Sequence, residues 1–360
     1  MTAGARDDAR DGLRDDARDG VRDGARDAPI VGILGCGVTG QAVGRALRAR
    51  GVRVAWHDRA VGVADRARRR LGGVVVDDPA DLGVTDVVVV TAPVAHAPIV
   101  HDLIAGRCHV VSVSDDPGDV RELLHLHEYA RSHGVSVAVG AALSPGLTGV
   151  LARHLADRLA VVDEIHVAMH GTAGPACARQ HHDSLGATAH GWHDGDWIDR
   201  PGGSGRELCW FPDPIGPADC YRAGLADPIT LHAAFPEVER ISARVSATRR
   251  DRLTARLPML SPPHAEGDRG AVRVEVRGAD GDGARVTFVL GSAGRVGDMA
   301  GTVAALFAEA FAGSGSLVRP EPGVHLAGQP GPLSRWMMGA AVTCGVSVHE
   351  FTGVARASAW

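Results

Sequence analysis

The chain has 360 residues, a length that allows two domains, and its 45% hydrophobic content is that of a globular protein. The net charge of −5 does not indicate a nucleic-acid partner, and no apolar run approaches the length of a membrane span. The chain contains no lysine, so all 38 cationic side chains are arginine. This excludes P-loop and Schiff-base chemistry, because both require a lysine.

Residues 1–28 are of low complexity, with Arg-Asp pairs recurring every four residues. Only Met1, Leu13 and Val21 are larger apolar residues, which is too few for a core. We therefore predict a disordered tail, with a partner-binding arm as the alternative. The tail does not have the basic-then-apolar pattern of a secretion signal, and the six cysteines form no C-x-x-C pair. Both observations favour a cytoplasmic protein with reduced thiols.

A glycine-rich turn follows the first apolar run. Residues 29–34 read as a strand, Gly35, Gly37 and Gly40 form a G-x-G-x-x-G pattern, and a helical pattern begins at residue 41. The first glycine allows a tight turn, the second lets the backbone approach a pyrophosphate, and the third lets the helix pack on the strand. The helix N-terminus, with Val38 and Thr39, offers free N–H groups to the phosphates. The pattern predicts a dinucleotide-binding site.

The second predicted strand, residues 52–57, ends in an acidic residue. Asp58 lies 18 residues beyond Gly40, where a carboxylate accepts hydrogen bonds from the adenosine ribose of NAD. Arg59 follows directly and could instead accept the 2′-phosphate of NADP. The sequence thus favours NAD and leaves NADP open. The alternative is an ordinary glycine-rich turn with a solvated acid at a strand end.

Strand and helix patterns alternate from residue 29 to residue 150, as a doubly wound parallel sheet requires. The apolar run 86–91 is typical of a central strand buried on both faces, and further strands are predicted at 109–113 and 135–139. We predict a Rossmann domain over 29–150. The strand ends that would face the cofactor there contain Thr91, Ala92, Pro93, Ser112 and Pro145.

The pattern changes beyond residue 150, and we predict an α+β substrate domain over 151–360. Strands are predicted at 162–170, 241–247, 271–277 and 285–290, in a mainly antiparallel sheet. Residues 171–217 read as a long irregular segment, of the kind that forms a lid or a binding loop. Helices are predicted at 297–312 and 333–341, and the C-terminal helix can pack back on the Rossmann domain.

These features together resemble the saccharopine dehydrogenase-like oxidoreductases. The glycine pattern, the run from Asp86 to Pro93, Ala105-Gly106 before His109-Val110-Val111, and the Pro145-Gly146-Leu147 turn carry the resemblance. The resemblance implies an NAD- or NADP-binding Rossmann domain and a second α+β domain that covers the substrate and often forms a homodimer. This sequence departs from the family at Ser112, where the family often has an aspartate.

Hydride transfer to a carbonyl or an imine also needs a proton donor. Residues 170–221 concentrate histidines and five of the 14 aromatic residues of the chain, which suits a pocket wall. From this segment we select Tyr221, whose neighbour Arg222 is cationic, together with His170 and His182, as candidate catalytic residues. The plainer interpretation is that each is a polar strand end or a core residue.

A metal site is the remaining interpretation of this segment. Four histidines and an acid lie close enough in sequence to bind zinc: His181, His182, His190, His193 and Asp183. With 18 histidines in the chain, such clustering also arises by chance. We therefore expect no metal.

The sequence predicts an NAD(P)-dependent oxidoreductase that transfers hydride to or from a C=N or C=O bond of a small polar, amino-acid-like substrate. Arg179, Arg206 or Arg222 could bind a substrate carboxylate. Two alternatives remain: a redox-neutral epimerase, lyase or cyclase with tightly bound NAD, and a non-catalytic nucleotide sensor. We expect a homodimer without nucleic-acid or membrane partners.

Overall fold

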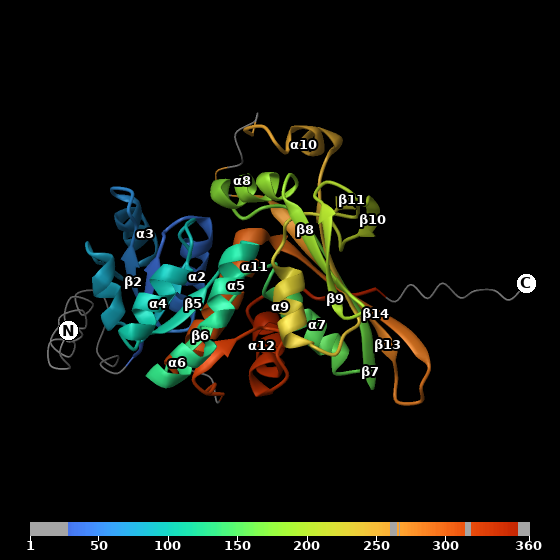
Figure 1. Ribbon diagram of the computed structural model, residues 1–360. Coiled ribbons are helices and arrows are strands. Elements are labelled where there is room, and N and C mark those ends of the chain that lie inside the picture. Colours follow the sequence, from blue (N-terminus) through green and yellow to red (C-terminus); the bar gives the residue numbers. More distant parts are fainter. Residues whose placement is uncertain (1–27, 260–264, 266, 314–317, 352–360) are drawn as a thin grey trace, which may run out of the picture.

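The first sheet and its helices occupy one side of the molecule, and the second sheet occupies the other (Figure 1). The computed structural model describes residues 28–259, 265, 267–313 and 318–351. The predicted tail lies outside these residues except for Ala28. None of the helices in these ranges is long and apolar enough to cross a membrane.

The first sheet is entirely parallel and has the strand order β15-β6-β5-β4-β1-β2-β3. Its strands are β1 (Ile30–Leu34), β2 (Arg53–His57), β3 (Val74–Val75), β4 (Val87–Val90), β5 (His109–Ser112), β6 (Ser136–Ala138) and β15 (Gly323–His325). The order from β3 to β6 is that of a Rossmann sheet, so the predicted fold class is confirmed.

Helices link these strands and cover the sheet. They are α2 (Val38–Ala49), α3 (Val63–Leu71), the 3₁₀ helix η2 (Pro79–Val84), α4 (Ala97–Ala105), α5 (Pro117–His125), α6 (His127–His133) and α7 (Leu147–Ala156). The four valines of β4 are fully buried, as expected for a central strand between two helical layers.

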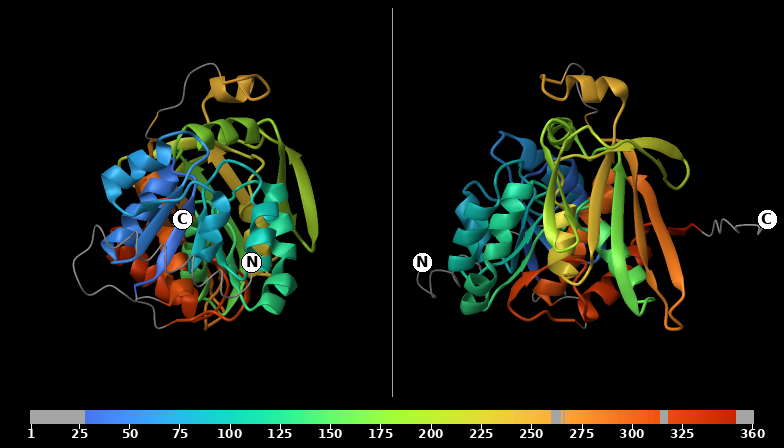
Figure 2. Two further views of the ribbon diagram at one scale, coloured as in Figure 1. Left: turned by 90° about the vertical axis from the view of Figure 1, so that its left-hand side faces the viewer. Right: turned by 45° about the vertical axis from the view of Figure 1, so that its right-hand side comes forward.

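The second sheet is mixed, with the order β10-β11-β12-β7-β13-β14-β16 and a β8–β9 hairpin attached to β12. Its strands are β7 (Val161–His170), β8 (Thr188–His193), β9 (Asp196–Pro201), β10 (Glu207–Trp210), β11 (Pro217–Tyr221), β12 (Arg240–Ser246), β13 (Arg269–Ala279), β14 (Arg285–Arg295) and β16 (His349–Glu350). β7 and β12 are parallel, and the other pairs are antiparallel. Two further helices accompany this sheet: α9 (Asp227–Ala234) and α10 (Arg249–Thr254), which lies beyond the ends of both sheets (Figure 2).

The prediction of an irregular segment over 171–217 is wrong. This segment forms α8 (Pro175–Ser184) and strands β8, β9 and β10. Asp194 and Gly195 connect β8 to β9 with positive φ angles of 50° and 85°, which is the backbone that a two-residue hairpin needs. Trp192 and Trp197 face each other across this hairpin with ring centroids 5.4 Å apart. An Asp-Gly pair between aromatic residues was therefore the signal that sequence reasoning missed.

The C-terminal part of the chain returns to the first sheet. Helix α11 (Val296–Ala312) packs against α2, and Arg50, the residue that follows α2, binds Glu309 of α11 through two hydrogen bonds. β15 pairs with β6 and extends the parallel sheet at its edge, and α12 (Pro332–Thr343) packs on α7 and α11. The first sheet is thus completed by residues that follow the second sheet in sequence.

Candidate functional site

The glycine loop between β1 and α2 has the geometry that its three glycines predict. Gly35 has a φ of +102°, and a Cβ atom there would lie 2.7 Å from the backbone nitrogen of Ala92. A Cβ atom on Gly40 would lie 2.0 Å from the carbonyl oxygen of Gly35, so helix and turn are in direct contact. At Gly37 a Cβ atom would meet nothing within 4 Å, so this backbone faces open space. The hydroxyl of Thr91 donates a hydrogen bond to Gly35 O at 2.6 Å and fixes the turn.

Three helices begin beside this loop. Val38 is the first residue of α2, and its side chain packs against Gly174, which precedes α8, and Gly297 in the first turn of α11. Cβ atoms built on these two glycines would lie 2.8 Å and 2.6 Å from Val38 methyl groups. The positive dipole ends of three helices therefore meet at the loop, which favours an anionic group there.

Asp58 connects the end of β2 to the glycine loop. Its Oδ2 accepts a hydrogen bond from the backbone N–H of Cys36 at 2.7 Å, and its Oδ1 accepts one from Ala60 N–H at 2.8 Å. Each carboxylate oxygen retains a further lone pair. Asp58 and Arg59 both line a cavity beside the loop.

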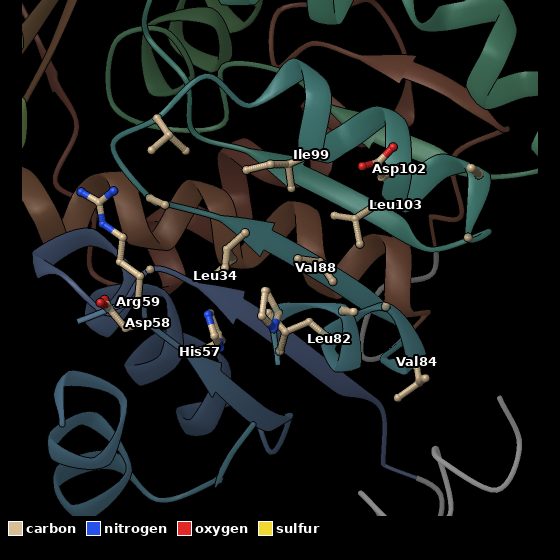
Figure 3. A pocket seen from close by; sticks show the side chains of 18 of the residues that line it. Leu34, His57, Asp58, Arg59, Leu82, Val84, Val88, Ile99, Asp102 and Leu103 are labelled. Atoms are coloured by element: carbon tan, nitrogen blue, oxygen red, sulfur yellow. The ribbon is translucent and has the colours of Figure 1, made fainter. Parts of the chain in front are cut away.

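This first cavity has a volume of about 970 Å³ and extends from the carboxyl ends of β1, β2 and β4 to the space between η2 and α4 (Figure 3). Asp58 and Arg59 lie at one end of it, while Leu34, Leu82, Ile99 and Leu103 form apolar walls. Ala92 and Pro93 also line the cavity. An apolar cavity with charged groups at its mouth suits a flat base joined to a ribose.

Two other predicted cofactor residues lie deeper. Ser112 is fully buried, and its hydroxyl oxygen lies 2.7 Å from Nδ1 of His96. This geometry favours support of the loop after β4 rather than direct contact with a cofactor. Pro145 is buried in the turn before α7. Beside it, the hydroxyls of Ser144 and Thr148 each donate a 2.6 Å hydrogen bond to the fully buried Asp227.

A second cavity, of about 550 Å³, lies between β7, α8, β12 and α10. His170 lines it at the end of β7, with its Nδ1 2.8 Å from the hydroxyl oxygen of Ser246. Burial lowers the pKa of His170, and the nearby carboxylate of Asp268 opposes this effect. The remaining lining combines apolar residues with polar and charged ones, which include Thr172, His181, His182, Asp219, Thr248, Arg250, Asp251 and Asp268.

The other two predicted catalytic residues have structural contacts. Nε2 of His182 lies 3.0 Å from the carbonyl oxygens of both Thr254 and Leu257, so this ring connects α8 to α10 and the turn after it. Tyr221 is 5% exposed and does not line the second cavity. The guanidinium of Arg252 lies 4.1 Å above the centre of its ring. Arg222, expected to act on this phenol, is not the cation that stacks on it. These contacts favour His170 among the three candidates.

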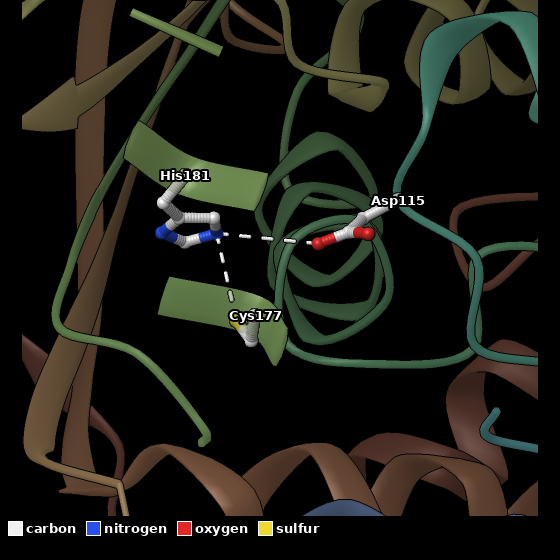
Figure 4. A group of neighbouring side chains, drawn as sticks. All are labelled: Asp115, Cys177 and His181. Atoms are coloured by element: carbon white, nitrogen blue, oxygen red, sulfur yellow. Dashed lines mark hydrogen bonds and ion pairs between the residues drawn. The ribbon is translucent and has the colours of Figure 1, made fainter. Parts of the chain in front are cut away.

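The histidines considered for zinc do not gather. His190 pairs with Asp199, and His193 pairs with Asp194. Within the described ranges, one group of three or more histidine, cysteine or acidic side chains brings its potential metal-ligand atoms close together. It consists of Asp115, Cys177 and His181 (Figure 4). Sequence reasoning missed Asp115 and Cys177. The four-residue spacing of Cys177 and His181 on a helix was a local signal, but nothing local connects them to Asp115.

The fold combines a Rossmann sheet, with a glycine loop after its first strand, and a second, mixed sheet. The fold is that of saccharopine dehydrogenase: the L-Glu-forming enzyme from Saccharomyces cerevisiae, solved in the apo state, superposes with a TM-score of 0.66 at 16% identity, over 90% of this chain and 99% of that one. A meso-DAP dehydrogenase variant from Clostridium tetani gives a TM-score of 0.46 at 12% identity, over 82% and 92% of the two chains. A myo-inositol dehydrogenase from Corynebacterium glutamicum gives 0.40 at 11% identity, over 72% and 74%. No protein-family profile and no curated protein sequence matches the chain.

Proposed function

We propose that this protein is an NAD(P)-dependent oxidoreductase that acts on a C=N or C=O bond of a small polar substrate. One observation carries the proposal. The backbone of the glycine loop is open at Gly37, and the carboxylate of Asp58 accepts a 2.7 Å hydrogen bond from the same loop. The fold that the chain shares with saccharopine dehydrogenase supports the same class.

The residues present fit a dinucleotide. The open backbone of Gly37 and the first N–H groups of α2, at Val38 and Thr39, would hold the pyrophosphate. Asp58 would accept hydrogen bonds from the ribose, and the apolar first cavity would take the adenine. The carboxylate of Asp58 repels a 2′-phosphate, so we propose NAD as the preferred cofactor, although Arg59 lies beside it in the cavity.

The cofactor would supply or accept the hydride, and His170 would handle the proton. When the hydroxyl of Ser246 donates to Nδ1, the neutral imidazole carries its proton on Nε2. Burial lowers the pKa of His170 and so favours the neutral ring, which can exchange a proton with a carbonyl or imine in the second cavity. The charged and polar side chains among the lining residues of this cavity support a small polar substrate.

We also propose a cytoplasmic homodimer. All six cysteines are free, which suits a reducing compartment. Leu208 and Trp210 lie on β10, the edge strand of the second sheet, and are 56% and 57% exposed. Large apolar side chains on an unpaired edge suit contact with a second copy. Sedimentation of the wild type and of Leu208→Ser/Trp210→Ser tests this: a dimer becoming a monomer supports the proposal, and a wild-type monomer rejects it.

The first experiment identifies any nucleotide released from the denatured protein by mass spectrometry and titrates the emptied protein with NADH and NADPH. Saturable binding of one reduced cofactor in the micromolar range supports an exchanging dehydrogenase. Stoichiometric NAD that survives purification supports the redox-neutral alternative. Absence of binding to either nucleotide rejects the proposal.

A second experiment tests His170. The enzyme is given a panel of 2-oxo acids together with ammonia or amines, and the oxidation of NADH is measured. His170→Gln is expected to lower kcat about 10²-fold or more while NADH affinity is unchanged. His193→Gln, on the exposed hairpin, is the matched control and is expected to retain activity. Equal activity of both variants would exclude His170 as the proton donor.

A further inference from the structure

One group of side chains brings an oxygen, a sulfur and a nitrogen atom close together. It consists of Asp115, Cys177 and His181. Asp115 lies three residues beyond the carboxyl end of β5, while Cys177 and His181 lie one turn apart on α8. Nε2 of His181 lies 3.8 Å from Cys177 Sγ and 4.0 Å from Asp115 Oδ2, and all three atoms lie within 4.8 Å of one another (Figure 4). The group thus joins the first sheet to the second domain.

These spacings are close to those of a metal site. Sulfur, nitrogen and oxygen ligands at zinc distances and tetrahedral angles lie roughly 3.3–3.6 Å apart. A small rotation of the three side chains would therefore bring their ligand atoms within bonding distance of one ion. Two of the ligands share a helix at positions i and i+4, and this spacing holds their relative placement fixed.

The carboxylate of Asp115 is paired with a histidine, His181, rather than with an arginine. Of the buried carboxylates, Glu275 pairs with Arg273 and Arg277, and Glu309 pairs with Arg50. Asp119 and Asp227 instead accept hydrogen bonds from backbone N–H groups and from hydroxyls, respectively. Among the residues that the structure describes, no arginine forms an ion pair with Asp115. The titratable groups that act on the carboxyl of Asp115 are His181 and, more weakly, the buried carboxyl of Asp227. When deprotonated, the carboxyl of Asp115 and the thiol of Cys177 would together supply two negative charges, which a divalent cation would balance.

The group is enclosed but can be reached. The side chains of His181 and Asp115 are 10% and 24% exposed, and His181 lines the second cavity. Three protein ligands and one accessible side are the arrangement of a catalytic zinc ion, which keeps a position open for water or substrate. A structural zinc site would instead be closed by four protein ligands.

We propose that Asp115, Cys177 and His181 bind one divalent transition-metal ion, with zinc as the preferred ion and a fourth position open to the second cavity. A mixed set of one thiolate, one imidazole and one carboxylate suits zinc better than magnesium or calcium, which prefer oxygen ligands. This proposal replaces our expectation that the chain holds no metal. It does not depend on hydride transfer, although an ion there could bind an oxygen of the proposed substrate.

Binding would release a proton. Burial raises the pKa of the Cys177 thiol to about 12, with Asp115 as a second cause, so the metal-free thiol is protonated at neutral pH. The Zn²⁺–S bond forms as the S–H bond breaks, and the proton passes to solvent without any change of oxidation state. Affinity is therefore expected to rise with pH.

The test uses the full chain, first by elemental analysis of the purified protein and then by titration of chelator-treated protein with Zn²⁺ and Co²⁺. We expect about one zinc per chain, and for Co²⁺ the near-ultraviolet absorption of a thiolate ligand. Cys177→Ala is expected to abolish that absorption and weaken zinc binding at least 100-fold. Cys344→Ala, which removes an exposed cysteine, is the matched control and should change neither.

His181→Gln provides a second variant that retains the thiol, in case Cys177→Ala fails to fold. It is expected to weaken zinc binding by a similar factor. A wild type that binds neither ion below millimolar concentration, or variants that bind both as tightly as the wild type, would overturn the proposal. NADH titration of the same samples separates this outcome from a failure of the proposed function, because the glycine loop lies outside the ligand set.

Discussion

Oδ2 of Asp58 accepts a hydrogen bond from the backbone N–H of Cys36 at 2.7 Å, which joins the end of β2 to the centre of the glycine loop. The two residues are 22 positions apart in sequence. The contact fixes the carboxylate that would select the ribose relative to the backbone that would hold the pyrophosphate. If the proposed function holds, cofactor choice and phosphate binding would therefore be coupled in this loop.

Replacing the charge of Asp58 is expected to change cofactor preference. Asp58→Asn preserves an oxygen that can accept from Cys36 N–H but removes the repulsion toward a 2′-phosphate. We expect the ratio of NADPH to NADH affinity to rise about tenfold, equivalent to about 1.4 kcal/mol. Fluorescence titration with both nucleotides measures it, and Asp65→Asn on α3, an exposed acid, is the control. An unchanged ratio would remove Asp58 from cofactor selection.

Two glycines of the loop are expected to respond in opposite ways to alanine. Gly37 has an ordinary φ of −70° and open space at its Cβ position, so Gly37→Ala should fold normally and bind nucleotide at least tenfold more weakly. Gly40→Ala places a methyl group 2.0 Å from Gly35 O, and we expect it to cost about 3 kcal/mol of unfolding free energy. Urea unfolding and NADH titration of both variants check this. Equal stability of the two variants would contradict the packing role of Gly40.

His96 is expected to make stability depend on acid pH. Burial lowers its pKa, an effect that Ala92 O and Asp119 oppose, so the folded state favours the neutral ring. As pH falls below 6.5, the unfolded chain binds this proton first, and stability falls until the folded pKa is reached, by about 1.4 kcal/mol per pH unit. His96→Gln should remove this part of the slope in urea unfolding between pH 7 and pH 5. His154→Gln, at an exposed position of α7, should leave the slope unchanged.

The contact between α2 and α11 is expected to depend on one buried ion pair. Glu309 is 3% exposed, and Arg50→Ala would leave its carboxylate uncompensated, at a cost of about 3 kcal/mol. Arg50→Met/Glu309→Leu should recover most of this loss. Arg45 and Asp298 form a half-exposed pair between the same helices, so Arg45→Ala should cost less than about 1 kcal/mol. Urea unfolding that ranks Arg45→Ala as the more costly variant would contradict this assignment.

The Rossmann sheet could be predicted because its signals are local. These signals are an apolar strand, three spaced glycines and an acid at the end of the next strand. Each acts within a few residues, through backbone sterics and hydrogen bonding. The β8–β9 hairpin carried a similar local signal at Asp194-Gly195, and it was overlooked. The parallel pairing of β7 with β12 was not predictable in this way, because it joins strands about 75 residues apart.

The glycine loop, the acid that follows it and the central buried strands can be predicted from the amino-acid sequence, because steric limits on the backbone and burial of apolar runs leave few alternatives there. The partner of each histidine, in contrast, depends on the packing of distant elements. His181 and His182 are adjacent in sequence, yet a helix rotates successive side chains by about 100°. One ring therefore points at Asp115 and Cys177 and the other at the carbonyls of Thr254 and Leu257. Contacts across 60 or more residues depend on how the two sheets pack, and no local pattern encodes that packing.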